Sequence, residues 1–290
     1  MKQLFALALL RRAVLAGSAF TFIACSDNGA ITQIAPAGKI NKKPSVIISP
    51  SRIFNNRHKV IHVFVALCDN LHQGIEPVPK GIGNGQDPGT NLYWGCDYGV
   101  KAFFKKYTGW QLVYTGKKAS AHILERCIFR HSLTGSYMVA DAYDGAFIKN
   151  TMQDFENAVA GAVTDTLIIK KDTLGIAGNA NMVAYVGHEG LMDVSIDSFP
   201  VQRDGRRRDI IILACESKQY WSRILQKNGA SPVLWTTELM CPEAYTLDAA
   251  IAGWLNNETG VQIQLRAATA YSKYQHCSLK AALHLLVSGY

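Results

Sequence analysis

The 290-residue chain lacks the short motifs that mark several large enzyme classes. It has no G-x-S-x-G sequence, so nothing indicates the nucleophile elbow of the serine α/β-hydrolases. The glycine-rich stretch Pro79–Asn91 does not fit a dinucleotide fingerprint, because a long insertion separates its glycines from the preceding apolar run. No Lys-Ser or Lys-Thr pair follows them to complete a P-loop. We therefore interpret this stretch as a surface loop that starts near the end of the first strand and lines a site there.

Motifs for metal binding are missing as well. No two cysteines have the spacing of a zinc knuckle. The sequence HEGLMD, which begins at His188, contains the first half of a zinc-protease HExxH motif, but Met192 occupies the position of the second histidine. We expect no metal site and no other cofactor.

Positive charge is in only mild excess. The formal net charge is +8, and three of the positive charges, Lys2, Arg11 and Arg12, lie in an N-terminal segment that we expect to be removed, which leaves +5. Much of the remainder lies in the cluster Arg203–Asp209, which is typical of a solvated loop. No basic stripe is interleaved with aromatic residues, so we expect no nucleic-acid partner.

The first 25 residues have the order of an export signal. Arg11 and Arg12 precede the apolar run Ala13–Ala24, which is too short to span a bilayer and is followed by Cys25. The segment resembles a bacterial lipoprotein signal, in which the cysteine becomes the lipidated N-terminus. Phe22 stands where that signal prefers leucine, so an ordinary secretory signal is an alternative. The pair Arg11-Arg12 also suggests a twin-arginine signal.

Each of these signals predicts a protein outside the cytoplasm. We expect the periplasmic face of a bacterial envelope membrane, reached through a lipid on Cys25, or secretion. Ser26 follows Cys25, and in lipoproteins of this type the absence of aspartate at that position favours the outer membrane.

Cysteine use leaves the role of Cys215 open. The chain has seven cysteines, and if Cys25 carries a lipid, the other six could form three disulfides in an oxidising compartment. Cys215 is then either a buried or disulfide-bonded core residue or a free nucleophile.

Three segments follow from the apolar pattern. Residues 1–25 are the signal, residues 26–57 are a polar tether without a sustained apolar period, and residues 58–290 are one α/β domain. We expect strands within Lys59–Asp69, Trp110–Gly116, Ser136–Tyr143, Met182–Gly187, Asp209–Cys215 and Ser231–Thr237. We expect helices within Gly99–Gly109, Ala119–Phe129, Phe147–Val163, Tyr220–Asn228, Ala244–Leu255 and Leu265–Val287.

Near-continuous apolar strands separated by connections of helix length predict a mainly parallel sheet in a three-layer sandwich. In such sheets ligands bind beyond the carboxyl ends of the strands. Asp69, His188 and Cys215 all fall at strand ends of this kind.

Two apolar blocks in the second half of the chain end in catalytic residue types. The first block ends in YVGHEG, which contains His188. The second block ends in IILACES, which contains Ala214-Cys215, and the strand-like PVLWTT follows it. In this order the blocks resemble those of the caspase-like (clan CD) cysteine peptidases, which include caspases, legumains, gingipains, clostripain and CHAT domains. The resemblance extends over Lys59–Leu255 in element order but over only about a dozen residues in motif.

This resemblance implies a caspase-like sheet and a mechanism. Cys215 would be the nucleophile and His188 the general acid/base, and the backbone N–H groups of Gly190 and Cys215 would hold the oxyanion. A thiolate attacks a carbonyl far better than a thiol, and an imidazolium or a helix N-terminus favours it. Glu189 departs from the family pattern, because it separates His188 from Gly190.

The resemblance also implies a substrate-binding residue. In caspases, a residue at the end of the first strand binds the substrate side chain before the scissile bond. Asp69 occupies this place here and would favour arginine or lysine in the substrate. The alternative is that Asp69 caps a turn.

Two functions follow from the sequence. The first is an exported, lipid-anchored cysteine peptidase with a peptide or protein substrate. The second is a non-catalytic envelope lipoprotein whose sandwich binds a partner or has a structural role, with His188 and Cys215 merely packing. A hydrolase or transferase that acts on something other than peptides is a third class.

Overall fold

The structure of the protein, a computed structural model, describes residues 54–117, 119–196 and 198–290, which lie within one compact unit. Its strands are β1 (Val60–Ala66), β2 (Trp110–Lys117), β3 (Ile123–His131), β4 (Tyr137–Tyr143), β5 (Thr164–Ile169), β6 (Asp172–Ala177), β7 (Met182–Val186), β8 (Asp209–Leu213), β9 (Ser231–Thr236) and β10 (Leu286–Val287). Its helices are α1 (Val100–Lys106), η1 (Gly145–Phe147), α2 (Ile148–Val159), η2 (Gly190–Met192), α3 (Ser217–Lys227), α4 (Ala244–Leu255), α5 (Gly260–Gln275) and α6 (Leu279–Leu285).

A mixed, mostly parallel sheet forms the centre of this unit. The described residues contain an eight-stranded sheet in the order β10-β9-β8-β7-β1-β4-β3-β2 and a separate two-stranded sheet of β5 and β6. Strands β4, β1, β7, β8 and β9 are parallel, whereas β10, β3 and β2 pair antiparallel at the two edges. The predicted α/β class and mainly parallel sheet are confirmed.

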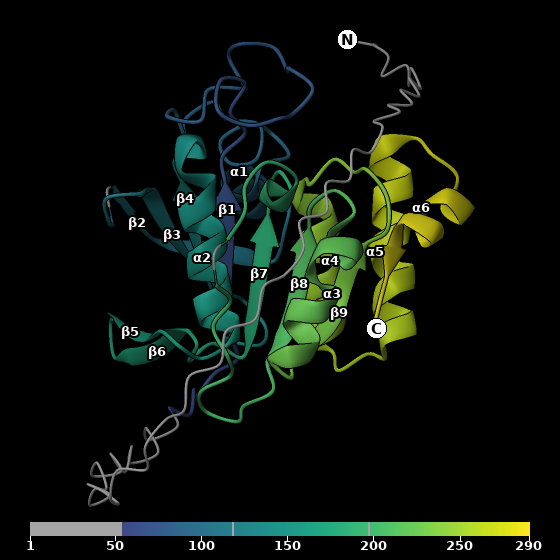
Figure 1. Ribbon diagram of the computed structural model, residues 1–290. Helices are drawn as coiled ribbons and strands as arrows, with labels where there is room; N and C mark the ends of the chain where they lie inside the picture. The colour runs from purple at the N-terminus through teal and green to yellow at the C-terminus, as the bar shows by residue number, and fades with distance from the viewer. Residues whose placement is uncertain (1–53, 118, 197) are drawn as a thin grey trace, which may run out of the picture. The chain divides into compact units, whose positions relative to one another are not determined.

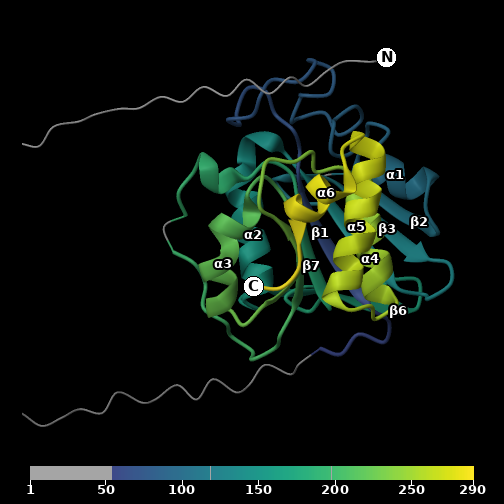
Figure 2. The same ribbon diagram turned by 90° about the vertical axis from the view of Figure 1, so that its right-hand side faces the viewer.

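Helices cover both faces of the sheet. Helices α2 and α3 pack on one face and α1, α4 and α5 on the other, with the sheet between them (Figure 2). In β1 the side chains alternate between the two layers, because Val63 and Val65 join the core under α1, α4 and α5, whereas Phe64 and Ala66 join the core under α2 and α3. The predicted three-layer sandwich is therefore confirmed.

Burial on both faces explains why the parallel strands are visible in the sequence. Every residue of β1, β4 and β7 is buried, and in β8 Asp209 alone is partly exposed. A strand without a solvent face shows a continuous apolar run instead of an alternation. The strand β7 points toward the loops at the top of Figure 1, where the carboxyl ends of the parallel strands lie.

Two expectations for secondary structure are wrong. The predicted helix Ala119–Phe129 is largely β3, because its residues pair antiparallel with both β2 and β4 and this pairing outweighs a helical apolar spacing. The predicted final helix Leu265–Val287 is divided into α5 and α6, because His276 adopts a left-handed conformation with φ 56° and ends α5.

The signal segment 1–25, including Cys25, lies outside the described residues, and so does the predicted tether 26–57 except for its last four residues. Among these, the Asn56 side chain donates a hydrogen bond to the carbonyl of Asn179 at 2.8 Å. Within the described ranges, no helix is both long and apolar enough to cross a membrane. The six cysteines of the described part are free thiols, so the possible three disulfides are not formed there.

Candidate active site

His188 and Cys215 each lie two residues beyond the end of neighbouring parallel strands. Strand β7 ends at Val186 and β8 ends at Leu213, and these two residues are register partners. The N–H of Gly187 donates to the carbonyl of Leu213 at 3.2 Å, which carries the pairing one step past the strands. Because paired strands are about 4.8 Å apart, this register brings both residues to the same edge of the sheet.

The imidazole of His188 is oriented by a carboxylate. His188 Nε2 lies 2.7 Å from Oδ2 of Asp193, and 6% of the His188 side chain is exposed. A carboxylate accepts hydrogen bonds, so Nε2–H of His188 is the donor in this contact. No hydrogen bond to Nδ1 occurs in the described part of the chain. The ring is thus oriented through Nε2, while Nδ1 is left without a hydrogen-bond partner there.

Asp193 is a functional candidate that the sequence reasoning missed. The short helix η2 turns the chain after Glu189, with the N–H of Asp193 bonded to the carbonyl of Gly190 at 3.0 Å, and returns the carboxylate to His188. Asp193 also accepts the N–H of Gly74 at 2.7 Å, from the loop after β1. An acidic residue shortly after a candidate histidine, as in HEGLMD, was the available signal, but its spacing fits neither strand nor helix periodicity.

The thiol of Cys215 contacts the loop after β9. Its Sγ donates to the carbonyl of Met240 at 3.6 Å and accepts the N–H of Met240 at 3.4 Å. Among the described residues, no hydrogen bond joins Cys215 to His188. Burial raises the pKa of the Cys215 thiol above its usual value, the N–H of Met240 opposes this shift, and Glu189 and Glu216 add to it. In this conformation the sulfur is therefore held as a thiol.

A sharp turn places Cys215 just before helix α3. Glu216 adopts a left-handed conformation with φ 49°, and its N–H donates to the carbonyl of Glu238 at 2.9 Å. The N–H of Ser217 donates to Oγ1 of Thr236 at 3.0 Å. Because β9 and its following loop accept both of these N–H groups, the turn after Cys215 is fixed. Helix N-termini favour anions, so a sulfur turned from Met240 toward the start of α3 would be favoured as a thiolate.

The two predicted oxyanion donors are both free of acceptors. Within the described residues, neither the N–H of Gly190 nor that of Cys215 donates a hydrogen bond. Gly190 is buried, and a Cβ at this position would clash with the sulfur of Met152, so a larger residue would displace the Met152 side chain or the turn. A buried N–H without an acceptor is costly unless a ligand binds it.

The side chain of Asp69 caps a turn, as the alternative interpretation of this residue expected. Its Oδ1 accepts the N–H of Leu71 at 2.9 Å, and its Oδ2 contacts Nδ1 of His72 and Nε2 of Gln86, each at 2.8 Å. Burial by itself would raise the pKa of Asp69, but hydrogen bonds from Gln86 and His72 outweigh it and hold the pKa below its ordinary value. A substrate cation would have to share this carboxylate with these groups.

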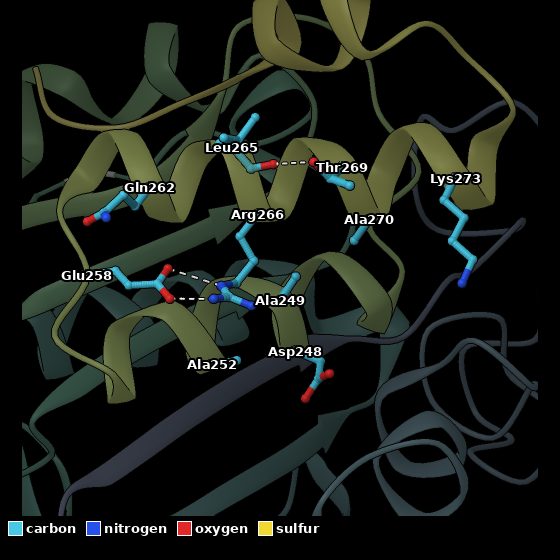
Figure 3. A pocket seen from close by; sticks show the side chains of 10 residues that line it. All are labelled: Asp248, Ala249, Ala252, Glu258, Gln262, Leu265, Arg266, Thr269, Ala270 and Lys273. Carbon is cyan, nitrogen blue, oxygen red and sulfur yellow. Dashed lines mark hydrogen bonds and ion pairs between the residues drawn. The ribbon is translucent and has the colours of Figure 1, made fainter.

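Three hollows on the described surface have neither His188 nor Cys215 in their lining. One of about 650 Å³ lies between the loop after η2 and helix α3 and is lined in part by Leu191, Tyr220 and Arg223. A pocket of about 500 Å³ adjoins Asp69 and is lined in part by Lys80, Gln86 and Thr90 of the glycine-rich loop. A groove between α4 and α5 contains the ion pair of Glu258 and Arg266 (Figure 3). None of the site residues named from the sequence lines the groove between α4 and α5, so the sheet edge remains the candidate active site.

No protein-family model, curated protein sequence or solved structure matches this chain. Interpretation of the site therefore depends on its residues and their geometry.

Proposed function

We propose that this protein is an exported, lipid-anchored cysteine peptidase with a caspase-like fold. The observation that carries the proposal is the placement of His188 and Cys215 at equivalent positions after β7 and β8, with two unused N–H donors at Gly190 and Cys215. The mostly parallel, helix-flanked sheet is compatible with that fold. Asp193 adds a carboxylate that orients the histidine.

In the proposed reaction, Nδ1 of His188 takes the thiol proton, and the sulfur of Cys215 attacks the carbonyl carbon of a peptide bond. The carbonyl oxygen becomes an oxyanion that accepts hydrogen bonds from the N–H groups of Gly190 and Cys215. The C–N bond then breaks as His188 gives the proton to the leaving amine, which leaves a thioester. Water, deprotonated by His188, attacks the thioester, releases the carboxylic acid and restores the thiol.

The thiol has to leave Met240 before it can react. Rotation of Cys215 away from the backbone of Met240 breaks two hydrogen bonds to sulfur, which are weak ones. Catalytic hydrogen bonds are often formed only when substrate is bound. We treat the contact with Met240 as the resting state of the nucleophile.

A second candidate function is favoured by the same contacts. Asp193 and Met240 give His188 and Cys215 partners of their own, and burial raises the pKa of the thiol. A non-catalytic envelope module that binds another protein would have this arrangement without any chemistry. The reactivity of Cys215 in the folded protein distinguishes the two functions.

A reactive peptide probe tests the proposed activity. We expect an electrophilic peptidyl ketone to modify Cys215 in the folded full-length protein, and a probe with arginine at the position next to the electrophile to react faster than one with aspartate, because Asp69 is anionic. Tandem mass spectrometry maps the modified residue, and Cys277, a partly buried thiol after α5, is the internal control. Modification only after unfolding would refute the peptidase, whereas equal rates for the two probes would refute only the role of Asp69.

The prediction of the cellular location depends on the signal segment. We expect the mature protein to begin at Cys25 with a lipid on its sulfur and to be held at the periplasmic face of the outer membrane. Mass spectrometry of the N-terminal peptide from membrane-extracted protein measures this directly. A retained Met1, or a mature N-terminus at another residue, would contradict the lipid anchor and leave the peptidase proposal standing.

A further inference from the structure

A buried hydrogen bond connects the loop that carries His188 to helix α3, which follows Cys215. The carboxyl of Glu189, the residue directly after His188, is fully buried, and its Oε2 accepts Nε1–H of Trp221 at 2.9 Å. Trp221 is also fully buried and belongs to α3, the helix that begins two residues after Cys215. The contact therefore runs from the histidine loop to the helix that follows the cysteine.

Both ends of this contact are held by other parts of the core. The second oxygen of Glu189 accepts the N–H of Leu191 at 3.3 Å, and the hydroxyl of Tyr185 donates to the carbonyl of His188 at 2.7 Å. The ring of Trp221 packs edge to face against Phe155 of α2, with their centroids 5.2 Å apart. Because packed rings and buried hydrogen bonds leave little freedom, the Glu189–Trp221 bond transmits the position of α3 to the histidine loop.

The charge state of Glu189 suits this position. Burial raises its pKa to about 8, against the opposing effect of hydrogen bonds from Trp221 and Leu191, so the carboxyl is neutral near pH 7. An ionised Glu189 would disfavour the thiolate of Cys215, whose pKa it raises. The neutral carboxyl still accepts the indole N–H. Glu189 can thus join the His188 loop to α3 without placing a full negative charge beside the nucleophile.

We propose that Glu189 and Trp221 are positioning residues that hold His188 at a fixed separation from Cys215. This inference rests on the proposed function, because it assigns the pair a role in the reactivity of the same dyad. It also gives a physical reason for Glu189, the residue inserted between His188 and Gly190. The side chain of Glu189 turns inward and contacts α3, while Gly190 begins η2 with its N–H unused.

The test measures the rate at which iodoacetamide alkylates Cys215 in the folded full-length protein at pH 7. Trp221→Phe removes the donor and keeps an aromatic ring, and Glu189→Leu removes the acceptor. Each should slow alkylation about tenfold, because a small displacement of an activating group has large kinetic effects. Glu189→Gln keeps an oxygen that can accept the indole N–H and should stay within about threefold of the wild type.

The His188→Ala background separates positioning from general stability. If the pair acts through His188, Trp221→Phe and Glu189→Leu should cause no further slowing once His188 is alanine. Glu156→Gln is the matched control, because Glu156 is also fully buried, its pKa is also raised to about 8 by burial, and its oxygens have no hydrogen-bond partner among the described residues. This variant should alkylate at the wild-type rate.

The outcomes distinguish the two proposals. If His188→Ala slows alkylation but none of the Glu189 and Trp221 variants does, the positioning role is refuted and the dyad stands. If the variants slow alkylation equally with and without His188, their effect is structural and the positioning role is again refuted. If His188→Ala has no effect, the dyad fails, and the positioning role fails with it. Thermal midpoints, measured for every variant, identify any that do not fold; if Glu189→Leu does not fold, Trp221→Phe, which keeps an aromatic ring in the core, decides.

Discussion

Replacing Cys215 with alanine should lower the turnover of a cleavable peptide by at least about 10³-fold, because the sulfur forms the covalent intermediate in the proposed reaction. The thermal midpoint should change little, since the side chain is partly exposed and its sulfur forms only two weak hydrogen bonds within the described residues, both with Met240. Initial rates with a fluorogenic peptide and a melting curve of the same sample measure both quantities.

A matched control variant and the outcome expected for a core residue both test this prediction. Cys277→Ala removes another partly buried free thiol, outside the site, and should keep full turnover. If Cys215 only fills the core, Cys215→Ala would instead lower the stability by about 1 kcal/mol or more through the cavity that it leaves. A destabilised Cys215→Ala protein, with no turnover in the wild type either, would therefore support the non-catalytic module, and normal turnover in the variant would refute Cys215 as the nucleophile.

His188→Ala is the second variant that we expect to lose activity. It should abolish turnover and also slow the alkylation of Cys215 near neutral pH about tenfold or more, because a protonated imidazole favours the thiolate by at least about one pKa unit. The rate as a function of pH should rise at a higher pH in this variant than in the wild type. Asp193→Asn should give an intermediate loss, since the amide can still contact Nε2 but carries no charge. Superimposable pH profiles for wild type and His188→Ala would end the dyad hypothesis.

The largest effect on stability is expected at Asp141, which is remote from the reaction. This residue of β4 is fully buried, and its oxygens contact Nε and Nη2 of Arg126 at 2.6 Å each and Nε2 of His62 at 3.0 Å. Asp141→Ala leaves the Arg126 guanidinium and the His62 ring without their buried partner. Removing one member of a buried ion pair typically costs about 3–5 kcal/mol. Urea unfolding followed by fluorescence measures the loss.

The stabilisation by Asp141 should depend on pH with a defined sign. Burial alone would raise its pKa, but Arg126 and His62 outweigh burial and hold the pKa below the ordinary value. A carboxyl whose pKa is lower in the folded state stabilises the protein above its unfolded-state pKa of about 4 and loses this effect as pH falls through the folded-state value. The difference in stability between wild type and Asp141→Ala should therefore shrink in acid.

The matched control for Asp141 is Asp97, which forms an exposed ion pair with Lys106 at 3.1 Å. Exposed pairs contribute little because water screens them. Asp97→Ala should accordingly leave the unfolding midpoint nearly unchanged. Equal losses for the two variants, or a wild-type midpoint for Asp141→Ala, would contradict the importance of the buried cluster.

The sequence did not predict β3, β5 or β6 as strands, and each case has a physical reason. The hairpin of β5 and β6 was missed because β5 is mostly exposed and forms no continuous apolar run. Its turn contains Lys170 with φ 53° and Lys171 instead of the asparagine and glycine that usually mark such turns. The sequence predicts a helix over β3 because its apolar spacing fits both periods, and pairing with β2 and β4 decides between them.

The sequence by itself determined the parallel sheet and the strand ends that carry Asp69, His188 and Cys215. Strands buried on both faces are apolar along most of their length, and this property can be recognised in the sequence alone. Only the tertiary structure decided which groups these residues contact: Asp193 for His188, Met240 for Cys215, and His72 and Gln86 for Asp69. It also decided the pairing of Glu189 with Trp221. Hydrogen-bond partners across loops depend on how the chain turns beyond each strand, and no periodic pattern in the sequence encodes those turns.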